Sequence, residues 1–247
     1  MSNTSVASVT AAPLDNSRAV QVLLILLSVI AGCTDVIGFL GLNGLFAAQI
    51  TGNWVLLAAH VVAGSPVEVA KLLSVPTFIV IVGLTMLLAD KLETIGRASL
   101  CPLLLLQFLL LAGFLAVCVA AGRHIDPNAT IAIFAGMLGV SAMAVQNALV
   151  QVSLKGAAAT AVMTTNFTRL AMDACAMLFR GDPDKAAKAR RRAAATLPVI
   201  AGFVVGCCLG AASEAALALR SLVLPTALAL LAFVIGFAAD ADAGRTA

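Results

Sequence analysis

The chain has few charged residues, and this scarcity sets its class. Charged residues make up 11% of the 247 positions, whereas hydrophobic residues make up 62%. Adding the glycines brings the apolar share to roughly 70%, against about 45–50% in soluble domains counted in the same way. A soluble fold with one core has no room for that much apolar surface. The composition therefore excludes an ordinary soluble domain and predicts an integral membrane protein.

Motifs for common catalytic and metal sites are also missing. The sequence has no Walker loop, no G-x-S-x-G elbow, no dinucleotide fingerprint and no H-E-x-x-H motif. The six cysteines lie in apolar stretches without a C-x-x-C pair, which favours small buried side chains over a disulfide framework or a zinc site. The two histidines are His60 and His124. We therefore expect neither an enzyme nor a bound cofactor or metal.

What the sequence does contain is a series of apolar runs. A bilayer-spanning helix needs roughly 20 such residues. Residues 1–18 precede the first run and are predicted to form a disordered cytoplasmic tail. The predicted helical segments are 19–41, 44–64, 74–89, 100–121, 129–150, 156–179, 194–212 and 215–239.

The eight segments fall into two sets of four in the same order, which indicates an internal duplication. Residues 19–121 form the first predicted membrane repeat, and residues 129–239 form the second. Thr51-Gly52-Asn53 interrupts the second segment, and the near copy Thr164-Thr165-Asn166 recurs 113 positions later in the sixth. The fold class we predict is an all-α polytopic membrane protein built from two homologous repeats.

Two topologies remain open. In the favoured one, segments 44–64 and 156–179 are broken or re-entrant helices and six full spans remain. Three full spans per repeat would invert the second repeat relative to the first. In the alternative, all eight segments span as two parallel four-helix repeats. Both kinds of arrangement occur in transporters.

The connection at residues 180–192 holds the largest group of basic residues. By the positive-inside rule this basic loop within the second repeat faces the cytoplasm, which places both termini there in either topology. The net charge of +3 is carried mainly by this loop and gives no indication of nucleic-acid binding. The basic residues are Arg180, Lys185, Lys188, Arg190, Arg191 and Arg192.

Polar side chains at membrane depth are costly and usually functional, so they are the candidate site residues. Gly52 weakens a helix, and the neighbouring Thr and Asn side chains can cap a fresh turn, which predicts a helix broken at mid-depth. We expect the two interrupted segments to form a substrate site at the repeat interface. The candidate residues are Asp35, Gln49, Thr51, Gly52, Asn53, Gln146, Asn147, Thr164, Thr165, Asn166 and Arg169.

Asp35 and Arg169 are the deep charges of this set. An ion pair between them would join the two motifs at one centre, and this is the arrangement we favour. Alternatively, Arg169 pairs with Asp173 one helical turn away. An unpaired Asp35 would be protonated, because burial raises the pKa of a carboxyl group, and it could then couple transport to protons.

Gly202, Gly206 and Gly210 form a G-x-x-x-G-x-x-x-G face. Small residues at this spacing let two helices approach closely. We expect this face to pack within the bundle, with a sliding or dimerising surface as the alternative.

Several of these residues carry a resemblance to a known family. Gly32-x-x-Asp35-x-x-Gly38-Phe39, the run 46–53, Gln146-Asn147 and Met163-Thr-Thr-Asn166 resemble the YoaK family of bacterial inner-membrane proteins, over roughly residues 20 to 238. That family is a domain of unknown function. The resemblance implies a multi-pass protein of the bacterial inner membrane and supplies no substrate. Members commonly carry a glycine where Thr165 stands here, so an equally flexible second break is not implied.

The sequence thus favours a small-solute transporter or channel-like protein with a polar site at the repeat interface. Its expected partners are the lipid bilayer and a small-molecule solute, and a homo-oligomer is left open. The alternative is a structural or assembly protein whose polar motifs only lock helix packing. Substitution of Asp35 or Asn53 would then lower stability without a substrate phenotype.

Overall fold

The computed structural model describes residues 18–66, 68–122, 126, 128–179 and 182–246, which contain helices and no strand. The all-helical prediction is confirmed for this part of the chain. The predicted tail, apart from Arg18, lies outside the described residues, as do His124 and Arg180. The elements are α1 (Arg18–Gly41), α2 (Ile50–Val62), α3 (Val69–Thr94), α4 (Leu100–Ala121), α5 (Thr130–Ser153), α6 (Met163–Phe179), α7 (Pro183–Leu217), η1 (Ala218–Leu222) and α8 (Val223–Thr246).

Apolar segments long enough to cross a membrane account for most of the molecule. Among the described residues there are 5 candidate spans, and the last of them contains α7, η1 and most of α8. These segments fit a multi-pass membrane protein. The spans are Arg18–Gly41, Val69–Thr94, Leu100–Ala121, Thr130–Ser153 and Pro183–Ala239.

In the predicted segments 44–64 and 156–179, the helices begin later than predicted. Residues 42–49 and 154–162 have no regular helix, and α2 and α6 start only after them. With 13 and 17 residues at 1.5 Å per residue, these helices measure about 20 and 26 Å, less than the roughly 30 Å of a hydrocarbon core. The first irregular segment turns at Asn43 and Gly44, whose φ angles are 53° and 84°.

The basic residues after 182 are helical, which corrects the predicted loop at 180–192. Asp182 caps α7 by accepting hydrogen bonds from the amides of Asp184 and Lys185, and Pro183 takes the first helical turn. Hydrogen bonds lower the pKa of the Asp182 carboxyl group: the bond with the Lys185 side chain has the largest effect, and the bonds with these amides add to it. The alanine, lysine and arginine residues that follow favour a helix, so α7 continues from this cap.

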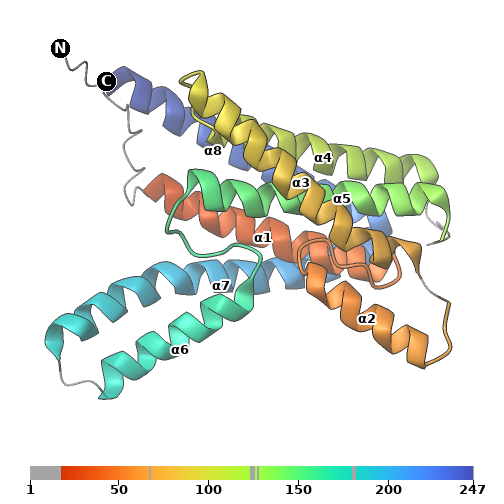
Figure 1. The fold of residues 1–247 in the computed structure, drawn as a ribbon, viewed down its shortest axis with the longest axis horizontal. Helices are drawn as coiled ribbons and strands as arrows, with labels where there is room; N and C mark the ends of the chain where they lie inside the picture. Colours follow the sequence, from red (N-terminus) through yellow and green to blue (C-terminus); the bar gives the residue numbers. More distant parts are fainter. Residues whose placement is uncertain (1–17, 67, 123–125, 127, 180–181, 247) are drawn as a thin grey trace, which may run out of the picture.

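The first half of the molecule, α1 to α4, contacts the second half, α5 to α8, through corresponding pairs of helices. In Figure 1, α1 and α5 run in opposite directions along the long axis of the bundle. Helix α1 packs on α7, and its counterpart α5 packs on α3; likewise α4 packs on α5, and α8 packs on α1. Helices α4 and α8 also pack on each other. Each main contact between the halves therefore has an equivalent contact, in which each helix is replaced by the helix at the same place in the other half.

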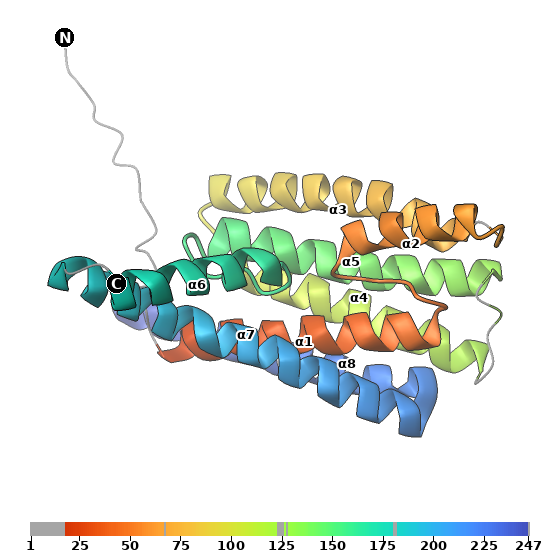
Figure 2. The same ribbon diagram turned by 90° about the horizontal axis from the view of Figure 1, so that it is seen from below.

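Helices α2 and α6 start near the middle of the long axis and run outward to opposite ends of the molecule (Figures 1 and 2). Helix α2 packs on α3, and α6 packs on α7. Each short helix is therefore attached to the long helix that follows it.

The glycine face of α7 lies against α1. A Cβ atom on Gly206 would lie 2.3 Å from the carbonyl oxygen of Val29, and one on Gly202 would lie 3.0 Å from that of Ile25. From the other side, a Cβ atom on Gly32 of α1 would lie 2.3 Å from the carbonyl oxygen of Phe203. Gly210 meets the backbone of Cys33 in the same way. These glycines therefore allow backbone-to-backbone contact between the halves.

Candidate functional site

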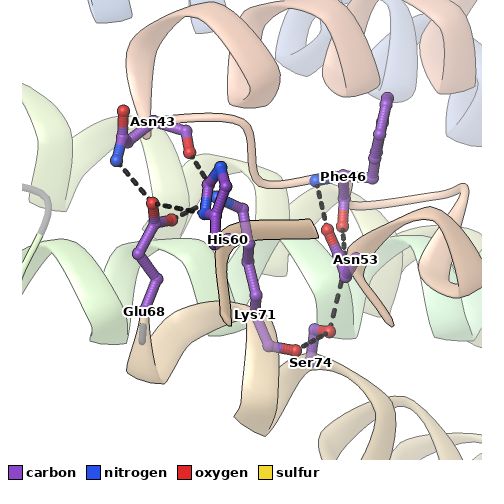
Figure 3. Close-up of polar contacts among 7 residues, drawn as sticks. All are labelled: Asn43, Phe46, Asn53, His60, Glu68, Lys71 and Ser74. Atoms are coloured by element: carbon purple, nitrogen blue, oxygen red, sulfur yellow. Dashed lines mark hydrogen bonds and ion pairs between the residues drawn. The ribbon is translucent and has the colours of Figure 1, made fainter. Parts of the chain in front are cut away.

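Asn53 holds the first irregular segment in place. Its Oδ1 accepts a hydrogen bond from the Phe46 amide at 2.9 Å, and its Nδ2 donates to the Phe46 carbonyl at 2.9 Å and to Ser74 Oγ at 3.0 Å (Figure 3). The residue is 0% exposed. A buried backbone needs such partners where no helix supplies them. Asn53 therefore joins the irregular segment to both α2 and α3.

The predicted helix break at Gly52 is wrong. Gly52 lies in the first turn of α2, and neither Thr51 nor Asn53 caps a later helix. A Cβ atom on Gly52 would lie 2.9 Å from the Phe46 ring, which in turn packs against Phe39 with ring centroids 4.9 Å apart. The glycine makes room for an aromatic side chain, and the chain leaves helical conformation earlier, in residues 42–49.

Asp35, on α1, also binds the first irregular segment, residues 42–49. It is 2% exposed and accepts hydrogen bonds from the amides of Ala48 at 2.6 Å and Gln49 at 3.1 Å. The expected ion pair with Arg169 does not form among the described residues, because Arg169 is exposed on α6. The Asp35 carboxylate therefore has backbone amides of residues 42–49 as its partners, and no cation.

Asp173 also has a partner other than the one considered from the sequence. Its Oδ1 accepts hydrogen bonds from Arg192, at 2.5 Å from Nη2 and 3.1 Å from Nε. The alternative pair of Arg169 with Asp173 is therefore replaced by a bond between α6 and α7.

In the second half, Gln146 and Asn166 hold residues 154–162. Gln146 Nε2 donates to the Leu27 carbonyl at 2.9 Å and to Thr160 Oγ1 at 3.0 Å. Asn166 Nδ2 donates to the Ala159 carbonyl at 2.6 Å, while its Oδ1 is buried without a hydrogen-bond partner among the described residues. The second segment is therefore held by fewer hydrogen bonds from its asparagine than the first.

The side chains of the remaining predicted site residues do not join these networks. Four of these residues are exposed: Gln49, Thr51, Thr164 and Thr165. Asn147 donates to the Met143 carbonyl of its own helix. Thr164 and Thr165 lie in the first turn of α6, so they do not cap a fresh turn after a helix break, as the sequence had predicted for this motif.

A buried charged cluster lies at the outer end of α2 and was not predicted. Lys71 Nζ donates to the Asn43 carbonyl at 2.7 Å and forms an ion pair with Glu68 (Figure 3). Asn43 Nδ2 donates to the other Glu68 oxygen at 2.7 Å, and His60 Nδ1 lies 3.5 Å from that oxygen. The Lys71 side chain is 1% exposed. One carboxylate therefore joins residues 42–49, α2 and α3. We call His60, Glu68 and Lys71 the outer cluster.

An open pocket with a volume of about 300 Å³ adjoins the outer cluster. Gly44 forms part of its wall, and a Cβ atom there would lie 3.4 Å from Lys71 Nζ. The pocket combines apolar walls with a few polar groups, as small-molecule sites do. Its lining residues are Phe39, Leu40, Asn43, Gly44, Leu56, His60 and Lys71.

The sequence carried one signal for this cluster. Glu68 and Lys71 are one helical turn apart in a short connection between two apolar runs, and His60 precedes Glu68 by eight positions. The prediction left residues 65–71 as a short polar connection, although α3 begins at Val69 and buries Lys71.

Comparison with known proteins places the chain in a family. A family model described as "Protein of unknown function (DUF1275)" matches residues 23–235. The chain belongs to this family, the YoaK family. No curated protein and no solved structure matches the chain.

The match to the YoaK family spans both irregular segments and the outer cluster. Because the family description names no activity, the chemistry of this member has to come from its own geometry. Asp35, Asn53, Gln146 and Asn166 are bound to protein groups, whereas His60 and Lys71 border a pocket. Within the part of the chain that the structure describes, the pocket beside the outer cluster is therefore a candidate site for solute contact.

Proposed function

We propose that this YoaK family protein is a small-solute transporter or channel-like protein with six full spans. Its halves are inverted repeats, and the short helices α2 and α6 are re-entrant elements that enter the membrane from opposite sides. The observation that carries the proposal is the pair of matching irregular segments, each followed by a short helix that runs outward (Figure 1).

Equivalent hydrogen bonds support the repeat. Asn53 binds the backbone of Phe46, and Asn166 binds that of Ala159. The donors are 113 positions apart, and so are the acceptors. The exchanged helix contacts and the opposite directions of α1 and α5 are what inverted repeats would produce.

Irregular backbone at membrane depth supports the transport role. It is tolerated only where it is buried in protein or lines a wet cavity, and transporters with inverted repeats place their sites at such broken helices. The amide dipoles of α2 and α6 point towards the middle of the molecule because both helices start there. A solute reaching this level would meet polar backbone in an otherwise apolar bundle.

The distribution of basic residues supports the orientation. The start of α1, the end of α5 and the start of α7 lie at one end of the molecule (Figure 1), and this end includes Arg18, Lys155 and the basic turns of α7. By the positive-inside rule that end is cytoplasmic. The outer cluster lies at the other end, so its pocket would open away from the cytoplasm.

Solute flux through proteoliposomes tests the proposal. Release of butyrate, glycerol, glycine and urea would be measured from liposomes with and without the protein. We expect at least one of them to leave faster with protein, and Leu56→Trp to slow it because the larger ring fills the pocket. Val61→Trp is the matched control on α2, since Val61 is 58% exposed and does not line the pocket. Equal fluxes for both variants would place the solute path elsewhere, and no flux above empty liposomes would contradict transport.

A structural or assembly role is the second candidate, and one observation favours it. Asp35, Asn53 and Gln146 are at most 2% exposed and bind protein groups. If they only lock the bundle, Asp35→Asn and Asn53→Ala lower thermal stability and Leu56→Trp changes nothing. A slower flux in Leu56→Trp at unchanged melting temperature separates the two candidates.

A further inference from the structure

The charges around the pocket nearly cancel. Lys71 is positive, Glu68 is negative, and His60 is neutral unless it gains a proton. The other lining residues carry no charge. A pocket with these groups has no excess positive charge for a lone anion.

Charged groups on the neighbouring elements do not change this balance. On α1, Asp35 is occupied by the amides of Ala48 and Gln49. On α7, Glu214 lies 3.8 Å from the position of a Cβ atom on Gly41, just beyond the pocket residues of α1. Both are acidic, so neither would attract an anion.

One N–H donor of the outer cluster remains available to a ligand. An ammonium group has three N–H donors, and Lys71 uses two of them, for the Asn43 carbonyl and for Glu68. His60 Nδ1 is buried, makes no hydrogen bond in the part of the chain that the structure describes, and lies 3.5 Å from Glu68 Oε1, so a proton on it would pair with Glu68 and leave the third Lys71 donor for the ligand. Both side chains line the pocket, whose lining also includes the apolar residues Phe39, Leu40 and Leu56. This arrangement suits a charged head and an apolar body.

We propose that the pocket binds a small carboxylate anion together with one proton, with Lys71 contacting the carboxylate and His60 holding the proton. The inference rests on the proposed function and specifies the solute class and the coupled ion of the same pocket. A second negative charge beside Glu68 would be costly to bury alone. A proton taken from solution by His60 removes that cost, because the cluster plus ligand then stays neutral. Histidine is the side chain that changes charge between about pH 5 and 8.

Binding to the purified full-length protein in detergent tests the inference. Titration calorimetry would measure the dissociation constants of butyrate, of propane-1-sulfonate, which stays ionised at both pH values, and of the neutral butyramide. Because a proton on His60 would add positive charge beside Lys71, we expect both anions to bind more tightly at pH 5.5 than at pH 7.5, and butyramide not to bind. Equal affinity of propane-1-sulfonate at both pH values, or equal binding of butyramide, would overturn the inference.

Two variants separate the roles of the cluster. His60→Asn should bind propane-1-sulfonate with less than a twofold difference between the two pH values, and Leu56→Trp should abolish binding without touching a charge. Lys71→Gln should abolish anion binding too, and its melting temperature reports whether it still folds. Unchanged pH dependence in His60→Asn, or unchanged binding in Leu56→Trp, would refute the assignment.

A failure of the carboxylate assignment can be told apart from a failure of the proposed transport function. If proteoliposomes carry a solute but no anion binds the pocket, the transport proposal stands and the carboxylate assignment is wrong. If the anions bind with the expected pH dependence but no flux is found, the pocket is a binding site in a protein that does not transport.

Discussion

At the scale of single residues, polar side chains replace the hydrogen bonds that a helix would otherwise provide. Asn53 pairs with both backbone groups of Phe46, and Asp35 accepts the next free amides of the same segment. Leaving a buried backbone group unpaired costs about 1–3 kcal/mol. These side chains are therefore the reason that irregular backbone persists inside an apolar bundle. Their burial alone indicates a structural task, and in the proposed function it is His60 and Lys71 that contact the solute.

The two asparagines make a quantitative comparison possible. Asn53→Ala should lower the free energy of unfolding by about 2–4 kcal/mol, since it leaves the amide and the carbonyl of Phe46 without partners. Asn166→Ala should cost only about 1 kcal/mol, since it strands one carbonyl and removes an oxygen that has no partner. Thr51→Ala, at an exposed position on α2, is the control and should stay within about 0.5 kcal/mol of the parent protein.

Thermal or denaturant unfolding in detergent measures these differences. A larger loss for Asn166→Ala than for Asn53→Ala would contradict the hydrogen-bond assignment.

At the scale of elements, the crossing of α1 and α7 joins the two halves, and it depends on small residues. The approach of Gly206 to the Val29 carbonyl leaves no room for a methyl group. Gly206→Ala should therefore lower the free energy of unfolding by about 1–3 kcal/mol, because the helices have to move apart. Gly83→Ala is the matched control in α3, where a Cβ atom meets nothing within 4 Å. It should leave stability unchanged or raise it, since alanine favours helix by about 0.5–1 kcal/mol.

Melting temperatures of the two variants, recorded by circular dichroism in the same detergent, check this prediction. Similar losses in both would mean that the α1–α7 contact is looser than its geometry indicates.

At the scale of the whole molecule, the sequence predicted two of the long apolar helices well, because length and hydropathy define them. The run 100–121 coincides with α4, and 19–41 matches α1 within one residue. Helix starts were harder to predict: α7 begins in the basic segment, where a cap and good helix formers outweigh the charge. Motif recurrence located Asn53 and Asn166 but not their partners, since Phe46 and Ala159 are ordinary apolar residues.

The outer cluster was missed for a different reason. Charged side chains in a short connection between apolar runs are usually solvated, and only the three-dimensional course of residues 42–49 buries Glu68 and Lys71. The Asp35–Arg169 pair failed because backbone amides, which no sequence pattern displays, satisfy the carboxylate.

The most direct test of the inverted, re-entrant arrangement is the side of the membrane on which two connections lie. Ser65, between α2 and α3, and Lys155, after α5, are exposed and suit single-cysteine substitution in a background without the native cysteines. With a membrane-impermeant maleimide on intact cells, we expect Ser65→Cys to be labelled and Lys155→Cys to be labelled only after lysis. Labelling of Lys155→Cys but not Ser65→Cys in intact cells would instead indicate eight full spans in parallel repeats and contradict the account.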